Sequence, residues 1–95
     1  MAYGIVHFFA GATQEQYDAT LVAVHGDKNT LPKGQLFHAA GPTPGGWTII
    51  ALHDSQQSWE EFRDGTLVPS LQKGIEGGFT APPEETAFEA YNVLP

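Results

Sequence analysis

Cysteine is absent from this sequence, and basic residues and long apolar runs are scarce. Without cysteine the chain forms no disulfide and offers no thiolate to a metal, which suits a reducing compartment, so we expect a cytoplasmic protein. Four Lys plus Arg stand against eleven Asp plus Glu, and the net charge of -7 disfavours a nucleic-acid partner because phosphates would be repelled. No run approaches the roughly 18 apolar residues that span a bilayer, so no membrane partner is expected.

What is present is the composition of one small globular domain covering residues 1–95. With 95 residues and 41% hydrophobic content, the chain buries only about 60 to 65% of its unfolded surface, so it is marginally stable as a single subunit. Its apolar start, MAYGIVHFFAGA, lacks the positive charge of a signal peptide and is interrupted by His7. It is interpreted as a first strand over residues 3–10.

The central stretch of the chain predicts a β-hairpin. Apolar runs at 36–40 and 47–52 flank a segment rich in proline and glycine, 41–46, which is expected to form the turn. In both runs, as in 3–10, apolar residues occupy odd and even positions alike, so both faces of the predicted sheet need covering.

Two helices and a last strand complete the pattern. Thr13 and Gln16 form a capping-box signature for a helix that runs to about His25, and Gly26 ends it. Asp54 or Ser55 caps a second helix, which is expected to kink near Gly65–Thr66 and resume around Pro69; a loop at 76–85 and a strand at 86–94 follow. The order is that of a ferredoxin-like βαββαβ fold: an antiparallel sheet in the order 4-1-3-2 with both helices on one face.

The other face of this sheet is expected to be apolar and bare. If each subunit buries about 600 Å² there, the gross gain is about 15 kcal/mol per subunit, so a homodimer joined sheet to sheet is predicted. A single-subunit protein with this surface would be poorly soluble.

Two motifs carry a resemblance to a known family. The segment HAAGPTPGGW at 38–47 and the pattern S-x-x-x-W-x-x-F-R-x-x-x-L-x-P-x-L at 55–71 resemble small bacterial members of the dimeric α+β barrel superfamily, near its antibiotic-biosynthesis-monooxygenase-like branch. The resemblance implies two sheets that meet face to face and a ligand cavity inside the barrel or between sheet and helices. Many such relatives are of unknown function.

Three of the four histidines, His7, His38 and His53, fall in predicted strands that are neighbours in the sheet. Histidine suits proton transfer near neutral pH, so His38 and His53 are candidate catalytic residues, although structural hydrogen-bonded side chains are the more common case. No HxH or HxxxH pattern supports a metal, and no cofactor is expected. His25 ends a helix, where a cation is favoured by the dipole.

The aromatic residues and one amide are candidates for a ligand pocket. Packing in the core or dimer interface is the commoner role for such aromatic groups, and Asn92 lies either at the rim or in a cavity. The candidate pocket comprises His7, Trp47, Trp59, Tyr91 and Asn92.

The resemblance transfers little catalytic detail. The haem-degrading relatives use an asparagine on the first strand, which this chain lacks, and Ala51 and His53 stand where close relatives often carry Asp and Trp. Only His38 lies on a family-like motif. Two functions therefore stand side by side: a cofactor-independent monooxygenase or isomerase with a small apolar or aromatic substrate, and a non-catalytic small-molecule-binding or interaction protein.

Overall fold

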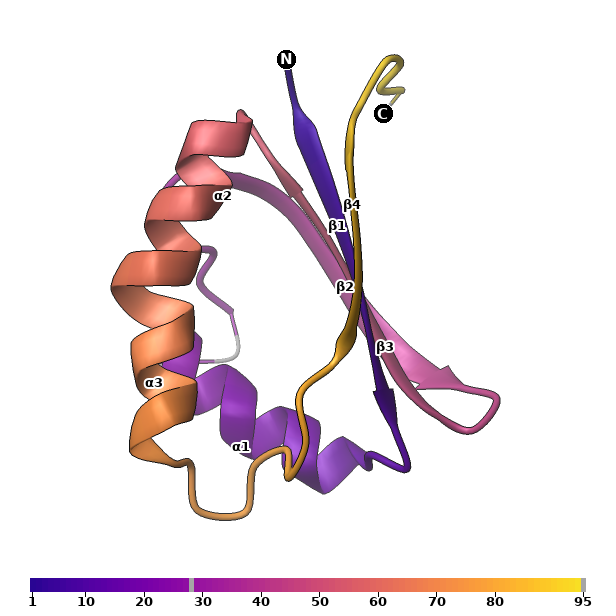
Figure 1. The fold of residues 1–95 in the computed structure, drawn as a ribbon, viewed down its shortest axis with the longest axis vertical. Coiled ribbons are helices and arrows are strands. Elements are labelled where there is room, and N and C mark those ends of the chain that lie inside the picture. The colour runs from indigo at the N-terminus through magenta and orange to yellow at the C-terminus, as the bar shows by residue number, and fades with distance from the viewer. Residues whose placement is uncertain (28, 95) are drawn as a thin grey trace.

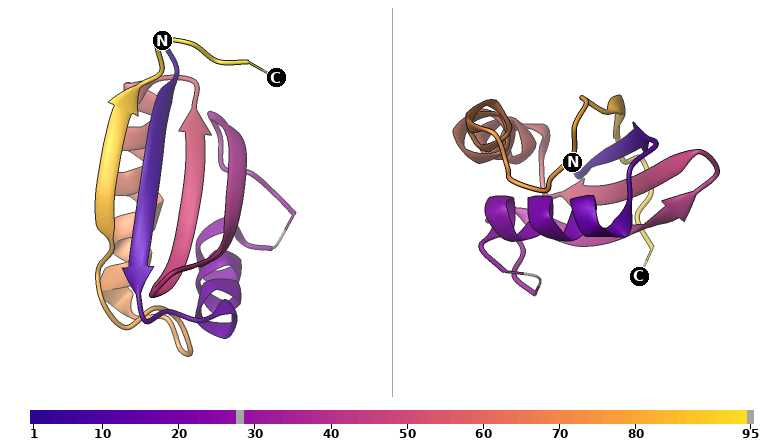
Figure 2. Two further views of the ribbon diagram at one scale, coloured as in Figure 1. Left: turned by 90° about the vertical axis from the view of Figure 1, so that its right-hand side faces the viewer. Right: turned by 90° about the horizontal axis from the view of Figure 1, so that it is seen from below.

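A computed structural model describes residues 1–27 and 29–94 as one antiparallel sheet with helices on a single face (Figures 1 and 2). The strands lie in the order β2-β3-β1-β4, which is the predicted order, and all three pairings are antiparallel. The elements are β1 (Tyr3–Ala10), α1 (Gln14–His25), β2 (Gln35–Thr43), β3 (Gly46–His53), α2 (Gln56–Phe62), the π-helical turn η1 (Arg63–Leu67), α3 (Val68–Lys73) and β4 (Glu84–Glu89).

Helix α1 begins and ends as its capping residues predict. The Thr13 hydroxyl accepts the Gln16 backbone N–H at 3.2 Å, and the Gln16 side-chain oxygen accepts the Thr13 N–H at 3.1 Å. Gly26 ends the helix with φ of 89°, a conformation open mainly to glycine, while its N–H donates to Val22. The capping box is therefore confirmed.

The second helical segment contains a π-helical turn at the position where a kink was predicted. Ser55 caps α2 by accepting the Ser58 N–H at 3.0 Å. Around Gly65 the Val68 N–H donates to the Arg63 carbonyl, five residues earlier, so the chain passes through a π-helical turn and continues as α3. Pro69 lies in the first turn of α3, where its missing N–H breaks no bond.

The two faces of the sheet explain why apolar residues occupy both parities. One lateral row on the face away from the helices runs Phe37–Leu52–Gly4–Phe88, and the next includes Ile50. Phe37 is 52% exposed, Ile50 45% and Phe88 49%, so this open face is apolar and uncovered in a single subunit. The prediction of an apolar sheet face that the helices leave bare is therefore confirmed.

The opposite face holds the core. The most buried apolar residues lie between the sheet and the helices or at one end of the sheet. The side chain of His53, a polar residue, is fully buried beside them. The apolar members of this core are Ile5, Phe9, Trp47, Ala51, Trp59 and Ala90.

The hairpin and the last strand differ from their predicted bounds. Strands β2 and β3 reach Thr43 and Gly46, so the turn is shorter than expected; Pro42 is tolerated because β2 is an edge strand and needs fewer donors. Strand β4 spans 84–89 instead of 86–94. Its partner β1 begins at Tyr3, opposite Glu89, so the residues beyond have no further strand residues to pair with.

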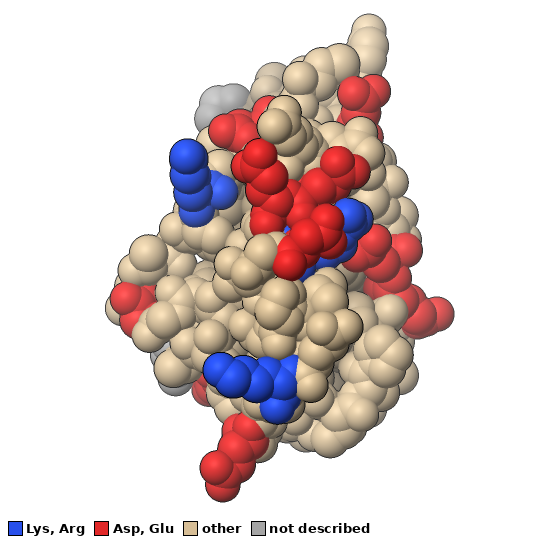
Figure 3. All heavy atoms as spheres, turned by 60° about the vertical axis from the view of Figure 1, so that its left-hand side comes forward, with Lys and Arg blue, Asp and Glu red and all other residues tan. Residues whose placement is uncertain are grey.

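Acidic groups predominate among the charged side chains. On the side formed by α2 and α3, Asp and Glu are more numerous than Lys and Arg (Figure 3), in keeping with the net charge of -7. In the described part of the chain, no helix has the length and apolar character needed to cross a membrane.

Candidate functional site

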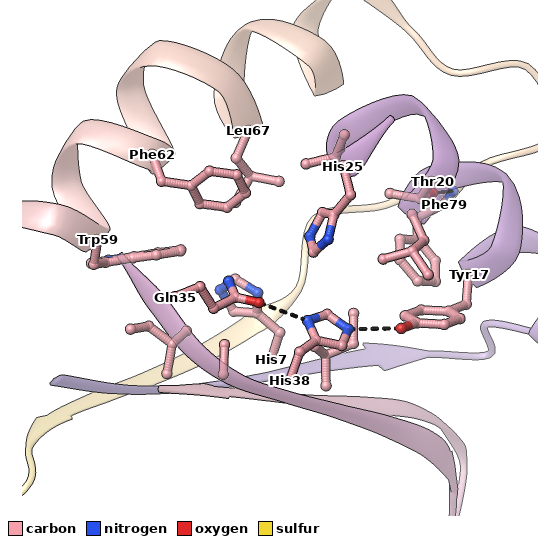
Figure 4. A pocket seen from close by; sticks show the side chains of 15 residues that line it. His7, Tyr17, Thr20, His25, Gln35, His38, Trp59, Phe62, Leu67 and Phe79 are labelled. Atoms are coloured by element: carbon pink, nitrogen blue, oxygen red, sulfur yellow. Dashed lines mark hydrogen bonds between the residues drawn. The ribbon is translucent and has the colours of Figure 1, made fainter. Parts of the chain in front are cut away.

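A cavity of about 70 Å³ lies between the sheet and the helices (Figure 4). Most of its wall is apolar, and polar side chains enter it from β1, α1 and β2. Its lining residues are Ile5, His7, Tyr17, Thr20, Leu21, Val24, His25, Gln35, His38, Ile49, Ala51, Trp59, Phe62, Leu67 and Phe79.

Helix spacing brings one side of this wall together. Tyr17, Thr20, Leu21, Val24 and His25 are separated by three, one, three and one residues, so they form one face of α1. The helix thus presents a phenol and an imidazole to the sheet at the two ends of an apolar stripe.

A β-bulge brings two polar residues of β2 to the same wall. Gln35 and His38 are three residues apart, and in a regular strand their side chains would face opposite sides. The register shifts between Gln35 and Phe37, so Gln35 pairs with His53 and His38 with Ala51, both on the helix-covered face. The bulge therefore builds the polar part of the site.

These residues belong to a continuous chain of side-chain hydrogen bonds. Tyr17 Oη lies 2.7 Å from His38 Nε2, and His38 Nδ1 lies 3.2 Å from Gln35 Oε1. Gln35 Nε2 lies 3.1 Å from His53 Nε2, and His53 Nδ1 lies 3.1 Å from Ser58 Oγ. Five side chains from α1, β2, β3 and α2 are linked in series.

Burial keeps the imidazoles of this region neutral. It lowers the pKa of His38 to about 4, with a smaller contribution from nearby His25. Burial also lowers the pKa of His53, although Asp54 acts in the opposite direction, and it lowers the pKa of His25. It raises the pKa of the Tyr17 phenol, and Asp18 adds to this effect. At pH 7 the pair of Tyr17 and His38 is therefore a neutral phenol beside a neutral imidazole.

His7 has a different environment. Its Nε2 lies 2.7 Å from Glu85 Oε1 across the β1–β4 pair, and its ring lies between those of Phe9 and Trp59, with centroids 6.1 and 5.8 Å away. The Nε2 of His7 is therefore already bonded to a carboxylate at the wall of the cavity.

The structure places the candidate residues in three groups. His7, His38 and Trp59 line the cavity, and His53 lies behind it, bonded to Gln35. Trp47 is buried against the Tyr17 ring, 5.4 Å between centroids, outside the lining. Tyr91 and Asn92 follow β4 and are exposed, Tyr91 at 94%, so they are remote from the cavity within this subunit.

Tyr17, Gln35 and His25 were not predicted as site residues. In the sequence, Tyr17 has only the spacing of an apolar residue on one face of the first predicted helix. Gln35 follows Gly34, at the end of the polar connection between that helix and the hairpin, and no motif marks it as a site residue. Within residues 1–27 and 29–94, no three His, Asp or Glu side chains are grouped as ligands for a metal ion.

A second, wider cleft of about 560 Å³ adjoins the cavity on its outer side. Val24, His25 and Phe62 line both, and the rings of His25 and Phe62 meet edge to face with centroids 6.1 Å apart. Ser58, the last member of the hydrogen-bonded chain, lines this outer cleft.

The element order and strand order define a ferredoxin-like α+β fold. No protein-family model matches the sequence, and no curated protein is similar to it in sequence. Solved structures are nevertheless similar over the whole chain. Rv0793 from Mycobacterium tuberculosis has a TM-score of 0.73 at 13% identity, with both chains fully covered.

Two Streptomyces proteins of known chemistry share the fold. SnoaB from Streptomyces nogalater, a cofactor-independent oxygenase solved as a mutant, has a TM-score of 0.61 at 14% identity, covering 99% of this chain and 96% of SnoaB. The ActVA-Orf6 monooxygenase from Streptomyces coelicolor, solved with nanaomycin D, has a TM-score of 0.60 at 17% identity, covering 99% and 91%. The resemblance to antibiotic-biosynthesis-monooxygenase-like proteins is confirmed as a likeness of fold.

Proposed function

We propose that the chain is a cofactor-independent monooxygenase whose substrate is a hydroxylated aromatic molecule with an oxidisable ring carbon. The observation that carries this proposal is the pair of Tyr17 and His38 at the wall of a mainly apolar cavity, with 2.7 Å between phenol oxygen and imidazole nitrogen. SnoaB is a cofactor-independent oxygenase and the ActVA-Orf6 monooxygenase binds nanaomycin D, and both findings support the same class of chemistry here.

The pair supplies a base for a substrate hydroxyl. A substrate O–H that donates to Tyr17 Oη passes its proton there while Tyr17 passes its own to His38 Nε2. The resulting aromatic anion gives one electron to O2, and the two radicals combine to form a C–O bond. His38 returns the proton to the peroxide, and loss of water then leaves a C=O at that ring carbon. The O–H and ring C–H hydrogens thus leave with one atom of O2 as H2O, the other oxygen atom enters the product, and the substrate supplies all the electrons.

The size of the cavity limits how the substrate is held. Ligand pockets usually measure about 300 to 1,000 Å³, several times the 70 Å³ found here. We therefore propose that one ring enters the cavity when the side chains of His25 and Phe62 separate, and that the rest of the molecule lies in the outer cleft.

Oxygen uptake with hydroquinones and anthrones tests the proposal. Turnover by the purified protein should need O2 and no added flavin or metal, and Tyr17→Phe and His38→Gln should each lower kcat by about 10²- to 10⁴-fold. Turnover without O2 consumption would instead indicate an isomerase that uses the same base. Equal rates in wild type and both variants would refute the role of the pair.

The small cavity also favours the non-catalytic alternative, in which the hydrogen-bonded chain only stabilises the core. In that case His38→Gln would lower the melting temperature, and no aromatic compound in the panel would be turned over. An enzyme would show a melting temperature little changed by the substitution, together with a loss of activity.

We also propose that two copies of the chain pair through the open sheet face. Phe37, Ile50 and Phe88 expose about half of their surfaces there, and a stable interface of this kind buries about 800 Å² per partner. A second copy presents the same apolar face and so matches it in shape and polarity.

A further inference from the structure

Gln35 occupies the middle of the hydrogen-bonded chain and uses both ends of its amide. It is a buried polar residue, 7% exposed, and it touches two imidazoles: His38 through Oε1 and His53 through Nε2. A glutamine buried in this way is held by the bonds it makes, because an unsatisfied amide in the core is costly.

The two ends of an amide are chemically different. The oxygen only accepts and the nitrogen only donates, so His38 Nδ1 carries a hydrogen for Oε1, while His53 Nε2 is a bare acceptor for Nε2–H. His53 Nδ1–H then donates to Ser58 Oγ, and His38 Nε2 is left with a lone pair that accepts the Tyr17 hydroxyl. All bonds run in one direction, from Tyr17 to Ser58.

The reversed amide would also bond both rings, but it fits the cavity less well. It would put a hydrogen on His38 Nε2, so that the Tyr17 oxygen became the acceptor. The phenol hydrogen would then have no acceptor among the described residues, since His38 is the one hydrogen-bond partner of the Tyr17 hydroxyl there. An unpaired hydroxyl in an apolar cavity is costly, so the direction found in the structure is preferred.

We infer that Gln35 is a positioning residue whose amide sets the tautomers of His38 and His53 together, and so presents the bare Nε2 of His38 to the Tyr17 hydroxyl. The catalytic use of that nitrogen rests on the proposed function, whereas the tautomers themselves do not. The bulge that turns Gln35 toward the helices is the backbone feature that makes this arrangement available.

Nitrogen-15 NMR of the histidine rings at pH 7 tests the inference directly. In the wild type we expect His38 and His53 both to be protonated on Nδ1 alone. His38 protonated on Nε2 would overturn the inference, because the ring could not then accept from Tyr17.

Gln35→Glu gives an asymmetric prediction. A carboxylate accepts at both ends, so His53 should move its hydrogen to Nε2 while His38 keeps its hydrogen on Nδ1. Retention of the Nδ1 hydrogen on His53 would contradict the role of the amide. Gln14→Glu, at the exposed start of α1, adds the same charge and should leave both rings unchanged.

The pH profile supplies a readout that a merely structural residue would not move. The groups that face His38 are Tyr17 and His25 from α1, Gln35 from β2, His53 of β3 through Gln35, and His7 of β1, which is bonded to Glu85 of β4. A carboxylate at position 35 should raise the pKa of His38 by about 1 to 3 units. The acid limb of kcat should shift with it, while KM stays nearly constant.

Ser58→Ala provides a second variant should Gln35→Glu fail to fold. It removes the acceptor of the His53 Nδ1–H at the outer end, and we expect the His38 tautomer to persist because Gln35 still holds it. Transfer of the His53 hydrogen to Nε2 while His38 keeps its own on Nδ1 would show that the Gln35 amide does not set the two tautomers together. If no substrate is turned over, the proposed oxygenase function fails, while the NMR results still decide the role of Gln35.

Discussion

If two copies pair through the open sheet face as proposed, replacement of Phe37 by lysine should separate them without unfolding them. Phe37 lies on edge strand β2, at one end of the open-face row, and is 52% exposed in one subunit. Since a buried phenylalanine covers about 200 Å², roughly 100 Å² per subunit is available to the partner. At about 25 cal/mol per Å² this amounts to about 2.5 kcal/mol for each copy.

Twofold symmetry doubles the effect, because each dimer loses two phenylalanines. The expected loss is about 5 kcal/mol per dimer, which raises the dissociation constant by about 3.6 orders of magnitude. Analytical ultracentrifugation between nanomolar and tens of micromolar protein measures this shift. Circular dichroism should show an intact fold, since the side chain is already exposed in the monomer.

Val22→Lys is the matched control. Val22 is 44% exposed on α1, on the side of the molecule away from the open sheet face, and the substitution changes the charge by the same amount. It should leave the dimer unchanged. A monomeric wild type at micromolar concentration, or equal dissociation constants for wild type and Phe37→Lys, would refute the sheet-to-sheet pairing.

Three further predictions concern stability. His38 has a pKa of about 4 when folded and about 6.5 when unfolded, so the unfolded chain binds more protons between these values. The free energy of unfolding should fall as the pH drops from about 6.5 to about 4; for this half-buried ring the loss is about 2 to 3 kcal/mol, seen in urea titrations as a steeper decline than in His38→Gln. Parallel pH curves would contradict it. Gly46→Ala places a methyl group against the Phe9 carbonyl oxygen and should cost about 3 kcal/mol, whereas Gly41→Ala, with open space around it, should cost little. Similar melting temperatures for the two variants would contradict the close approach of Gly46 to Phe9. Thr13→Ala removes the cap of α1 and should cost about 1 kcal/mol in the same assay, and an unchanged midpoint would show that the cap does not contribute.

The fold could be predicted because its signals are local or follow from general topology rules. The capping pair of Thr13 and Gln16 marks the start of a helix by its own spacing. Apolar residues at both odd and even strand positions indicate a sheet whose two faces both need to be covered. The extent of β4 could not be predicted in this way. The alternating pattern continues to residue 94, but strand pairing stops at Glu89, which lies opposite Tyr3, the first residue of β1. Tyr3 lies 86 residues earlier in the sequence, so the pattern around β4 carries no sign of this limit.

The site was less predictable than the fold. The three strand histidines share the helix-covered face, which neighbouring strands alone could not establish. The hydrogen-bonded link between His38 and His53 depends on Gln35. A β-bulge turns the Gln35 side chain toward the helices, and no residue pattern in the sequence predicts that bulge. Tyr17 has the spacing of an ordinary core residue, and only the position of His38 opposite it reveals the phenol as a polar group of the cavity.

The edges of the sheet determine what kinds of larger assembly are open to this chain. On one edge, the bulge and Pro42 interrupt the row of donors along β2, so an incoming strand from another molecule would find a broken ladder. On the other edge, β4 carries Glu84, Glu85 and Glu89, whose charges would repel an identical strand. Lateral growth into ribbons or fibrils is therefore disfavoured at both sides, and the pairing proposed above, which uses the open face of the sheet, would leave both edges unpaired without inviting further copies.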